Sequence, residues 1–164
     1  MPVKKILTVF DSEQILRTKS SPILISDPEL PIIIQDIKDT LFATANGVGL
    51  AAVQIGYLKR IFALKKEFII NDLDEHSIFT KSGESILIFI NPKIISEKGI
   101  LHESEGCLSV PDKCVKIQRA SIVKVKAFDD QGQQFYERMR GLAARAVQQE
   151  IDHLDGVLIL DYDK

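Results

Sequence analysis

Residues 148–156, QQEIDHLDG, carry the pattern that decides how this chain is interpreted. On a helix Gln149 and His153 share one face, because they are four residues apart, and Glu150 lies beside them. The pattern is therefore QExxH. With histidine first it would be HExxH, in which two imidazoles bind a metal ion and the glutamate moves a proton of the bound water. The stretch raises the question of whether a metal centre survives with glutamine at one ligand position.

The helix around this pattern is expected to be buried. From Leu142 to Leu154 there is no glycine or proline, and Gly156 suits a C-terminal cap. Its apolar positions cover most of the helix circumference: 142, 143, 146, 147, 151 and 154. QExxH is frequent by chance, and a satisfied polar edge is its ordinary interpretation. However, a carboxylate such as Glu150 on a nearly apolar helix needs a partner or a function. The following VLILDY (157–162) is strand-like and is expected to return the chain to the core.

Length and composition indicate a single-domain protein without a nucleic-acid or membrane partner. A chain of 164 residues with 45% hydrophobic residues predicts one domain over residues 1–164. The net charge of −2 and the lack of a basic run argue against direct binding to nucleic acid. In residues 1–14, MPVKKILTVFDSEQ, Asp11 interrupts the apolar stretch far short of a signal peptide or membrane span. We expect a first strand or an arm there, and no membrane partner. Cys107 and Cys114 are then reduced thiols of a cytoplasmic protein, with a disulfide as the minor alternative.

Helices are expected near both ends of the chain. Residues 27–45, DPELPIIIQDIKDTLFATA, place an aspartate and two prolines before four apolar residues on one helical face: Ile34, Ile37, Leu41 and Ala45. This predicts an amphipathic helix packed on a core. The next segment, NGVGLAAVQIG (46–56), has three glycines, which let the main chain approach a ligand closely.

The middle of the chain is expected to be strands. RIFAL (60–64) and ILIFI (86–90) are apolar runs of strand length, with NDLDEHS (71–77) as a surface loop between them. Apolar residues 123, 125 and 127 alternate with lysines before DDQG (129–132), which predicts a hairpin with one wet face. The fold class is therefore α+β: antiparallel sheets around a central C-terminal helix, with the helix of residues 31–45 outside.

Two further segments carry candidate chemistry. In ESEGCLSVP (103–111), the Cys107 thiolate would be a good ligand for zinc or ferrous iron, although a lone cysteine is more often a small buried residue. In GVGLAAVQ (47–54), the Gln54 amide could donate an N–H to a developing oxyanion, although a surface glutamine is the ordinary interpretation.

Together the three segments resemble the peptide deformylase family, whose marks are GxGLAAxQ, EGCLS and QHExDHLxG. Here they stand in the same order as GVGLAAVQ (47–54), EGCLS (105–109) and QQEIDHLDG (148–156). The resemblance covers nearly the whole chain. It implies the deformylase fold and hydrolytic removal of the formyl group from N-terminal formylmethionine. It also implies a cofactor, ferrous iron (Fe²⁺) or zinc (Zn²⁺), a formylated nascent peptide as partner near the ribosome, and a monomer.

The resemblance also implies roles for individual residues. Cys107 and His153 match metal ligands, and Glu150 matches the general base. Gln54 and the backbone N–H of Leu108 match the oxyanion hole.

Four further positions match family positions around the substrate. Val48 and Gly49 match a loop whose main chain pairs with the peptide as an added strand. Glu105 is placed with the substrate-binding residues, and we expect it to form an ion pair with Arg119 that supports the metal loop.

The departure from the family pattern is Gln149, which stands where the family has its first helix histidine. A glutamine carbonyl is a hard, neutral donor, weak for zinc or iron beside a thiolate. Loss of even an outer partner lowers metal affinity by ~10–100-fold, so we expect at least that loss. His76 lies in the polar loop. His102 would need a sharp bend of its strand to reach Cys107 and is expected to be an ordinary half-exposed residue.

Two hypotheses follow from this departure. The first is a working deformylase with a weakened metal site, in which Gln149 Oε1 or a water completes the coordination. The second is a deformylase-like protein without the reaction, which keeps a peptide groove as a binding or regulatory module. The sequence favours impaired or absent activity, since metal sites rarely tolerate loss of a ligand. An unrelated metalloprotease is disfavoured, because the cysteine and glycine segments fit the deformylase pattern.

Overall fold

A computed structural model describes residues 3–163 of the chain, so the expectations that fall on Met1, Pro2 and Lys164 lie outside the described residues. The helices are α1 (Val9–Leu16), α2 (Leu30–Phe42), α3 (Lys66–Ile69), α4 (Ile78–Lys81) and α5 (Gly141–Leu154). Short 3-10 turns are η1 (Ala52–Ile55), η2 (Ile70–Asp72) and η3 (Ile159–Tyr162). Within residues 3–163, no helix has the length and apolar character needed to cross a membrane.

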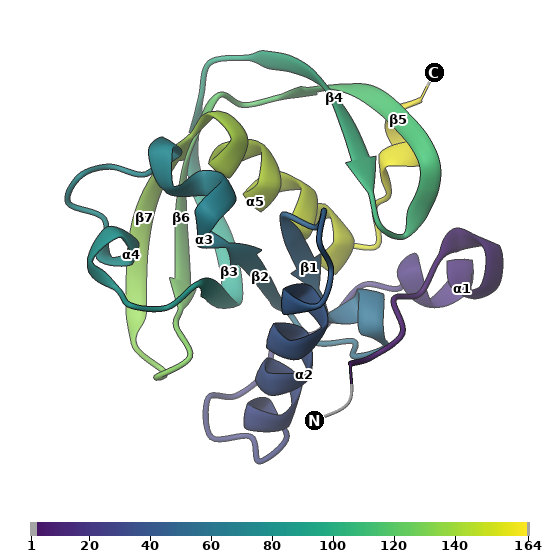
Figure 1. Ribbon diagram of the computed structural model, residues 1–164, viewed down its shortest axis with the longest axis horizontal. Helices are drawn as coiled ribbons and strands as arrows, with labels where there is room; N and C mark the ends of the chain where they lie inside the picture. The colour runs from purple at the N-terminus through teal and green to yellow at the C-terminus, as the bar shows by residue number, and fades with distance from the viewer. Residues whose placement is uncertain (1–2, 164) are drawn as a thin grey trace.

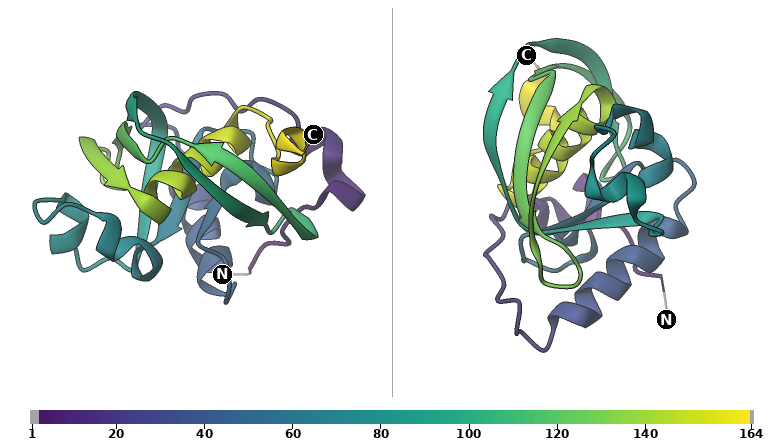
Figure 2. Two further views of the ribbon diagram at one scale, coloured as in Figure 1. Left: turned by 90° about the horizontal axis from the view of Figure 1, so that it is seen from above. Right: turned by 90° about the vertical axis from the view of Figure 1, so that its left-hand side faces the viewer.

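The strands form two antiparallel sheets. Five of them pair in the order β1-β2-β3-β6-β7, with bounds β1 (Gly49–Ala51), β2 (Ile61–Lys65), β3 (Ile86–Lys98), β6 (Ile122–Phe128) and β7 (Gln134–Arg140). The second sheet is a ribbon of β4 (Leu101–Cys107) and β5 (Val110–Arg119), which runs past α5 (Figures 1 and 2). The expected α+β fold, with antiparallel sheets and a C-terminal helix packed on the sheet, is confirmed.

Helices pack on both faces of the five-stranded sheet. Successive side chains of a strand point to opposite faces, so one strand can contact both layers of helices. In β2, Phe62 and Leu64 pack with α5, whereas Ile61 and Ala63 pack with α2. Burial on both faces explains why β2 and the start of β3 read as continuous apolar runs. The hairpin of β6 and β7 has one apolar face, with Val123 buried toward α5. The helix that carries QExxH is therefore fixed on the sheet.

Three local expectations were wrong. VLILDY forms no strand: Leu158 and Ile159 are buried, but Asp161 accepts a hydrogen bond from the Leu158 N–H and closes a 3-10 turn. The helix expected over residues 27–45 ends at Phe42, and Ala45 is exposed beyond it. Near the N-terminus the strand alternative fails, since a helix begins at Val9; the residues before it form an extended arm.

Candidate metal centre and active site

The three motif segments meet at one cavity of about 460 Å³. The glycine loop before β1, the end of β4 and one face of α5 line it, and eight of the expected site residues are among the lining, the first six being Val48, Gly49, Gln54, Cys107, Leu108 and Glu150. Gln149 and Glu105 also line the cavity. His153 lies behind the lining and is 1% exposed. The fold thus brings together segments that are far apart in the sequence.

Cys107 and His153 form the closest pair of potential metal donors. The Cys107 Sγ lies 3.2 Å from Nε2 of His153. Burial, together with the charge of Arg119, lowers the pKa of His153 to about 4. Burial also raises the pKa of the Cys107 thiol to about 12, with the charge of Glu150 as the next cause. Two such atoms can converge on one ion at bond lengths of ~2.0–2.3 Å. A cation there would offset the burial cost of the thiolate.

Glu150 lies beside this pair as a buried carboxyl group that is 3% exposed. Its Oε1 has no hydrogen-bond partner among the described residues. Burial raises the pKa of Glu150 to about 8, and the charge of Glu105 adds to that rise. A group that exchanges its proton near neutral pH is suited to general acid–base catalysis.

Gln54 is buried at 2% exposure, so the surface interpretation of this residue was wrong. Its Oε1 accepts a hydrogen bond from the Ala51 N–H at 2.8 Å. Its Nε2 donates to Ser109 Oγ at 3.0 Å and lies 3.9 Å from Cys107 Sγ. The amide orientation is therefore fixed, with the N–H donors toward the cysteine. Sequence reasoning missed Ser109, whose only signal was a hydroxyl between Leu108 and Val110.

Gln149 is joined to the cysteine loop instead of being free. Its Nε2 donates to Glu105 Oε1 at 2.9 Å and to the Gly106 carbonyl at 3.3 Å. Glu105 forms the expected ion pair with Arg119, through two hydrogen bonds of 2.8 and 2.9 Å. Both side chains are buried, at 4% and 6% exposure. The pair ties β4 to β5 directly beside Cys107.

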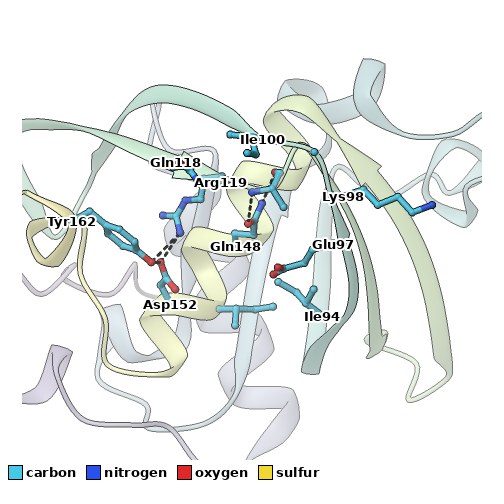
Figure 3. A pocket seen from close by; sticks show the side chains of 12 residues that line it. Ile94, Glu97, Lys98, Ile100, Gln118, Arg119, Gln148, Asp152 and Tyr162 are labelled. Atoms are coloured by element: carbon cyan, nitrogen blue, oxygen red, sulfur yellow. Dashed lines mark hydrogen bonds and ion pairs between the residues drawn. The ribbon is translucent and has the colours of Figure 1, made fainter.

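Two further residues, which sequence reasoning missed, contact the Arg119 guanidinium group. Its Nη1 donates to Asp152 Oδ2 at 2.6 Å, and the Tyr162 hydroxyl donates to the same oxygen at 2.7 Å (Figure 3). Burial alone would lower the pKa of Arg119, but Glu105 and Asp152 raise it above its ordinary value. Arg119 therefore stays charged. Asp152 was visible inside the helix motif, but nothing in the sequence indicated its partner.

A second cavity of about 560 Å³ lies on this side of Arg119 (Figure 3). Its polar side chains largely form hydrogen bonds within the protein. Gln148 Oε1 accepts from the Ala120 N–H at 3.0 Å, and Gln148 Nε2 donates to the Ala120 carbonyl at 2.9 Å. Of the expected site residues it contains Arg119 alone. The chemistry is therefore at the first cavity.

The remaining histidines lie away from the site. His102 is exposed on β4 and its Nε2 lies 3.0 Å from Gln118 Oε1, as expected for an ordinary strand residue. The His76 side chain is 86% exposed, beside Glu75. Over residues 3–163, histidine, cysteine, aspartate and glutamate side chains nowhere gather in a group of three or more that could hold a metal. The candidate strong donors are therefore the pair already described, Cys107 and His153.

The cavity is also bordered by an open strand edge. β1 pairs with β2 on one side and ends the five-stranded sheet, and Val48 and Gly49 at its start line the cavity. An edge strand presents backbone N–H and C=O groups with which an extended peptide can pair.

This fold, with the three motif segments gathered at one cavity, places the chain with metal-binding hydrolases. The model of the family "Polypeptide deformylase" matches residues 3–164. The chain belongs to the peptide deformylase family, whose members are metal-binding hydrolases of protein biosynthesis that act on formylated nascent peptides.

Relatives and solved structures agree over nearly the full length. The chain is 40% identical over 161 residues to the peptide deformylase of Caldicellulosiruptor bescii, covering 98% of this chain and 86% of the relative. It is similar to the crystal structure of the Thermotoga maritima peptide deformylase, with a TM-score of 0.82, 32% identity and coverage of 100% and 99%. It is also similar to a Met-Ala-Ser-bound class I type b deformylase of Acinetobacter baumannii, with a TM-score of 0.80, 27% identity and coverage of 98% and 99%.

Proposed function

We propose that this protein is a peptide deformylase whose activity is impaired by a weakened metal site. The observation that carries the proposal is the 3.2 Å contact between Cys107 Sγ and His153 Nε2. The buried Glu150 and the edge strand β1 border the same cavity as Cys107. The substrate would be the N-terminal formylmethionine of a nascent chain.

The donor set fits a divalent ion in part. Cys107 and His153 would hold ferrous iron or zinc, which are suited to thiolate and imidazole. The unpartnered Glu150 Oε1 beside them fits a site that a cation and its water complete. When bound, the ion would lower the pKa of water and polarise the formyl oxygen. The third position falls to Gln149, which we interpret as a replacement of the family histidine, or to water.

The chain's own residues would carry the steps. The backbone at Val48 and Gly49 would pair with the peptide as an added strand. Glu150 would take a proton from the attacking water and pass it to the departing amine as the C–N bond breaks, so that formate and a free amino terminus leave.

The oxyanion that develops on the formyl oxygen, as water attacks the formyl carbon, would be held by two donors. Gln54 contributes the amide whose Nε2 already points toward Cys107, and Leu108 contributes its backbone N–H. Because Ala51 fixes the Gln54 amide, no reorientation is needed when the charge develops.

A second candidate is a peptide-binding homologue without the reaction. It is favoured by Gln149, because a neutral amide that already donates to Glu105 replaces a strong ligand. This protein would keep the groove beside β1 and serve as a binding or regulatory module.

Metal content and turnover measured on the same sample test the proposal. The protein is purified anaerobically, its metal content is measured by elemental analysis, and formyl-Met-Ala-Ser is the substrate. Gln149→His should raise both metal content and turnover, whereas Gln131→His, which adds an imidazole at an exposed turn, should change neither. Metal with slow turnover in the unmutated protein supports the impaired enzyme. Turnover absent in both the parent and Gln149→His would contradict it and favour the binding module.

Other properties stay predictions. We expect a single domain over residues 1–164, a monomer and a cytoplasmic location. Size-exclusion chromatography with light scattering would check the monomer.

A further inference from the structure

The orientation of the Gln149 amide is fixed by its two acceptors. A side-chain amide has a donating end and an accepting end, and the two are exchanged by rotation about one bond. Nε2 of Gln149 donates to Glu105 Oε1 at 2.9 Å and to the Gly106 carbonyl at 3.3 Å. Both partners accept: the Gly106 carbonyl has no hydrogen to donate, and both oxygens of Glu105 already accept hydrogen bonds from Arg119. The reversed amide would place oxygen against two oxygens.

Glu105 faces cationic donors on both of its oxygens. Arg119 donates to each of them, at 2.9 and 2.8 Å, and Arg119 also donates to Asp152 (Figure 3). A second cation, Arg145, places its Nε 3.7 Å from Glu105 Oε2. Glu105 Oε1 therefore acts as an acceptor and takes the N–H end of the Gln149 amide.

The other end of the amide is the oxygen. In the described part of the chain, Gln149 Oε1 makes no hydrogen bond, while Nε2 makes two. Gln149 lines the cavity that Cys107 and Glu150 line, and it is one helical turn from His153 on the same face of α5. The oxygen is therefore the group of Gln149 that is free to act as a donor there.

The geometry points to Glu105 as a positioning residue that keeps the Gln149 amide turned with its oxygen available to a divalent cation held by Cys107 and His153. The inference rests on the metal site of the proposed function and adds its third donor and the group that orients it. The resulting set of one thiolate, one imidazole and one neutral amide oxygen predicts a weaker site than one with two imidazoles, but stronger than Cys107 and His153 alone.

Cobalt(II) titration of the metal-free chain tests this, since the visible absorption of bound cobalt reports its ligands without any turnover. Gln149→Ala should lower cobalt affinity by ~10-fold and alter the spectrum. Glu105→Gln should lower it similarly, because a neutral amide at 105 can donate to the Gln149 oxygen and reverse it.

Glu103→Gln is the matched control, since it neutralises an exposed carboxylate on the same strand β4 without touching Gln149 or Arg119. It should leave cobalt affinity and spectrum close to those of the parent. Equal losses in Glu103→Gln and Glu105→Gln would overturn the positioning role, and an unchanged Gln149→Ala would overturn the donor role.

A measurement on the unmutated chain avoids any variant that fails to fold. With ¹³C-labelled glutamine carboxamides, zinc should shift the Gln149 carbon signal, whereas Gln148, one residue away but bonded to Ala120, should stay in place. No shift at Gln149 in the zinc-bound protein would overturn the inference. Deformylation is measured separately. If cobalt binding depends on Gln149 but the protein shows no turnover, only the proposed function is refuted. If the protein shows turnover but Gln149→Ala leaves cobalt affinity unchanged, only this inference is refuted.

Discussion

The side-chain amide of Gln149 donates a 2.9 Å hydrogen bond to Glu105, across 44 residues of sequence. The same Glu105 oxygen accepts a hydrogen bond of 2.8 Å from Arg119. Gln149 is therefore integrated into the polar network around the cysteine loop. Its side-chain amide has one fixed orientation, with Nε2 turned toward Glu105 and the Gly106 carbonyl.

The Glu105–Arg119 pair should be a major source of stability. Removing one partner of a buried pair leaves the other charge poorly compensated, so Glu105→Gln should lower the free energy of unfolding by about 3 kcal/mol. Urea denaturation measures this. The exposed pair of Asp74 and Arg140 is the control, and Asp74→Asn should cost less than about 1 kcal/mol. Equal costs for the two variants would show that the buried pair has no special weight.

Gly49 should tolerate no side chain. A Cβ there would lie 2.8 Å from Leu64 Cδ2 and 3.0 Å from Glu150 Oε2, so Gly49→Ala must move one of them. We expect a loss of about 1–3 kcal/mol of stability and a fall in turnover, because Glu150 is displaced. Gly83→Ala meets nothing within 4 Å and should change neither quantity. Thermal unfolding and kinetics on both variants check this, and normal turnover in Gly49→Ala would argue against a close fit at β1.

Glu150 should be required for the proposed reaction. Glu150→Gln keeps the shape of the side chain but cannot take a proton, so kcat should fall by ~10²–10⁴-fold while metal content stays unchanged. Glu103→Gln, at an exposed position on β4, should leave kcat as it is. Steady-state kinetics with elemental analysis distinguish the two. If Glu150→Gln retained parental kcat, another group would have to move the proton.

Tyr57 should make stability depend on alkaline pH. Its hydroxyl donates to the buried Asp36 at 2.6 Å, and this hydrogen bond raises the pKa of Tyr57 to about 12. Because the folded pKa lies above the ordinary value of 10.0, the bond's contribution is complete below pH 10 and is lost as pH rises through about 12.

Ultraviolet titration of tyrosinate measures the shift. Of the three tyrosines in the chain, one should titrate at lower pH in Asp36→Asn than in the parent. The stability difference between the parent and Tyr57→Phe should shrink above pH 10. A parental titration curve in Asp36→Asn would mean that Asp36 does not raise the pKa of Tyr57.

Local periodicity explains what could be predicted of the fold. The alternation at Val123 and Val125 gave the correct hairpin, and the apolar pattern from Leu142 onward gave the buried helix, because each pattern directly reports which face is buried. The pattern failed at VLILDY, where a side chain of the segment, Asp161, caps its own backbone and converts an apolar run into a 3-10 turn. Apolar runs of that length do not by themselves distinguish a strand from a turn of helix.

The candidate site, like the fold, could be predicted only in part from the sequence. The motifs named Cys107, His153, Glu150 and Gln54. The fold brings three of them to one cavity, with His153 in contact with Cys107, although their roles stay predictions. The sequence did not indicate that Ser109 binds Gln54, or that Asp152 and Tyr162 hold Arg119.

The sequence by itself therefore determined the α+β class, the helix that carries QExxH and the family, since all three depend on patterns local to the chain. Only the tertiary structure decided which further polar atoms pair: that Glu105 takes the N–H end of Gln149, and that Asp152 accepts hydrogen bonds from both Arg119 and Tyr162. The physical reason is that hydrogen bonds between distant segments depend on orientation as well as proximity, and neither is encoded in residue spacing.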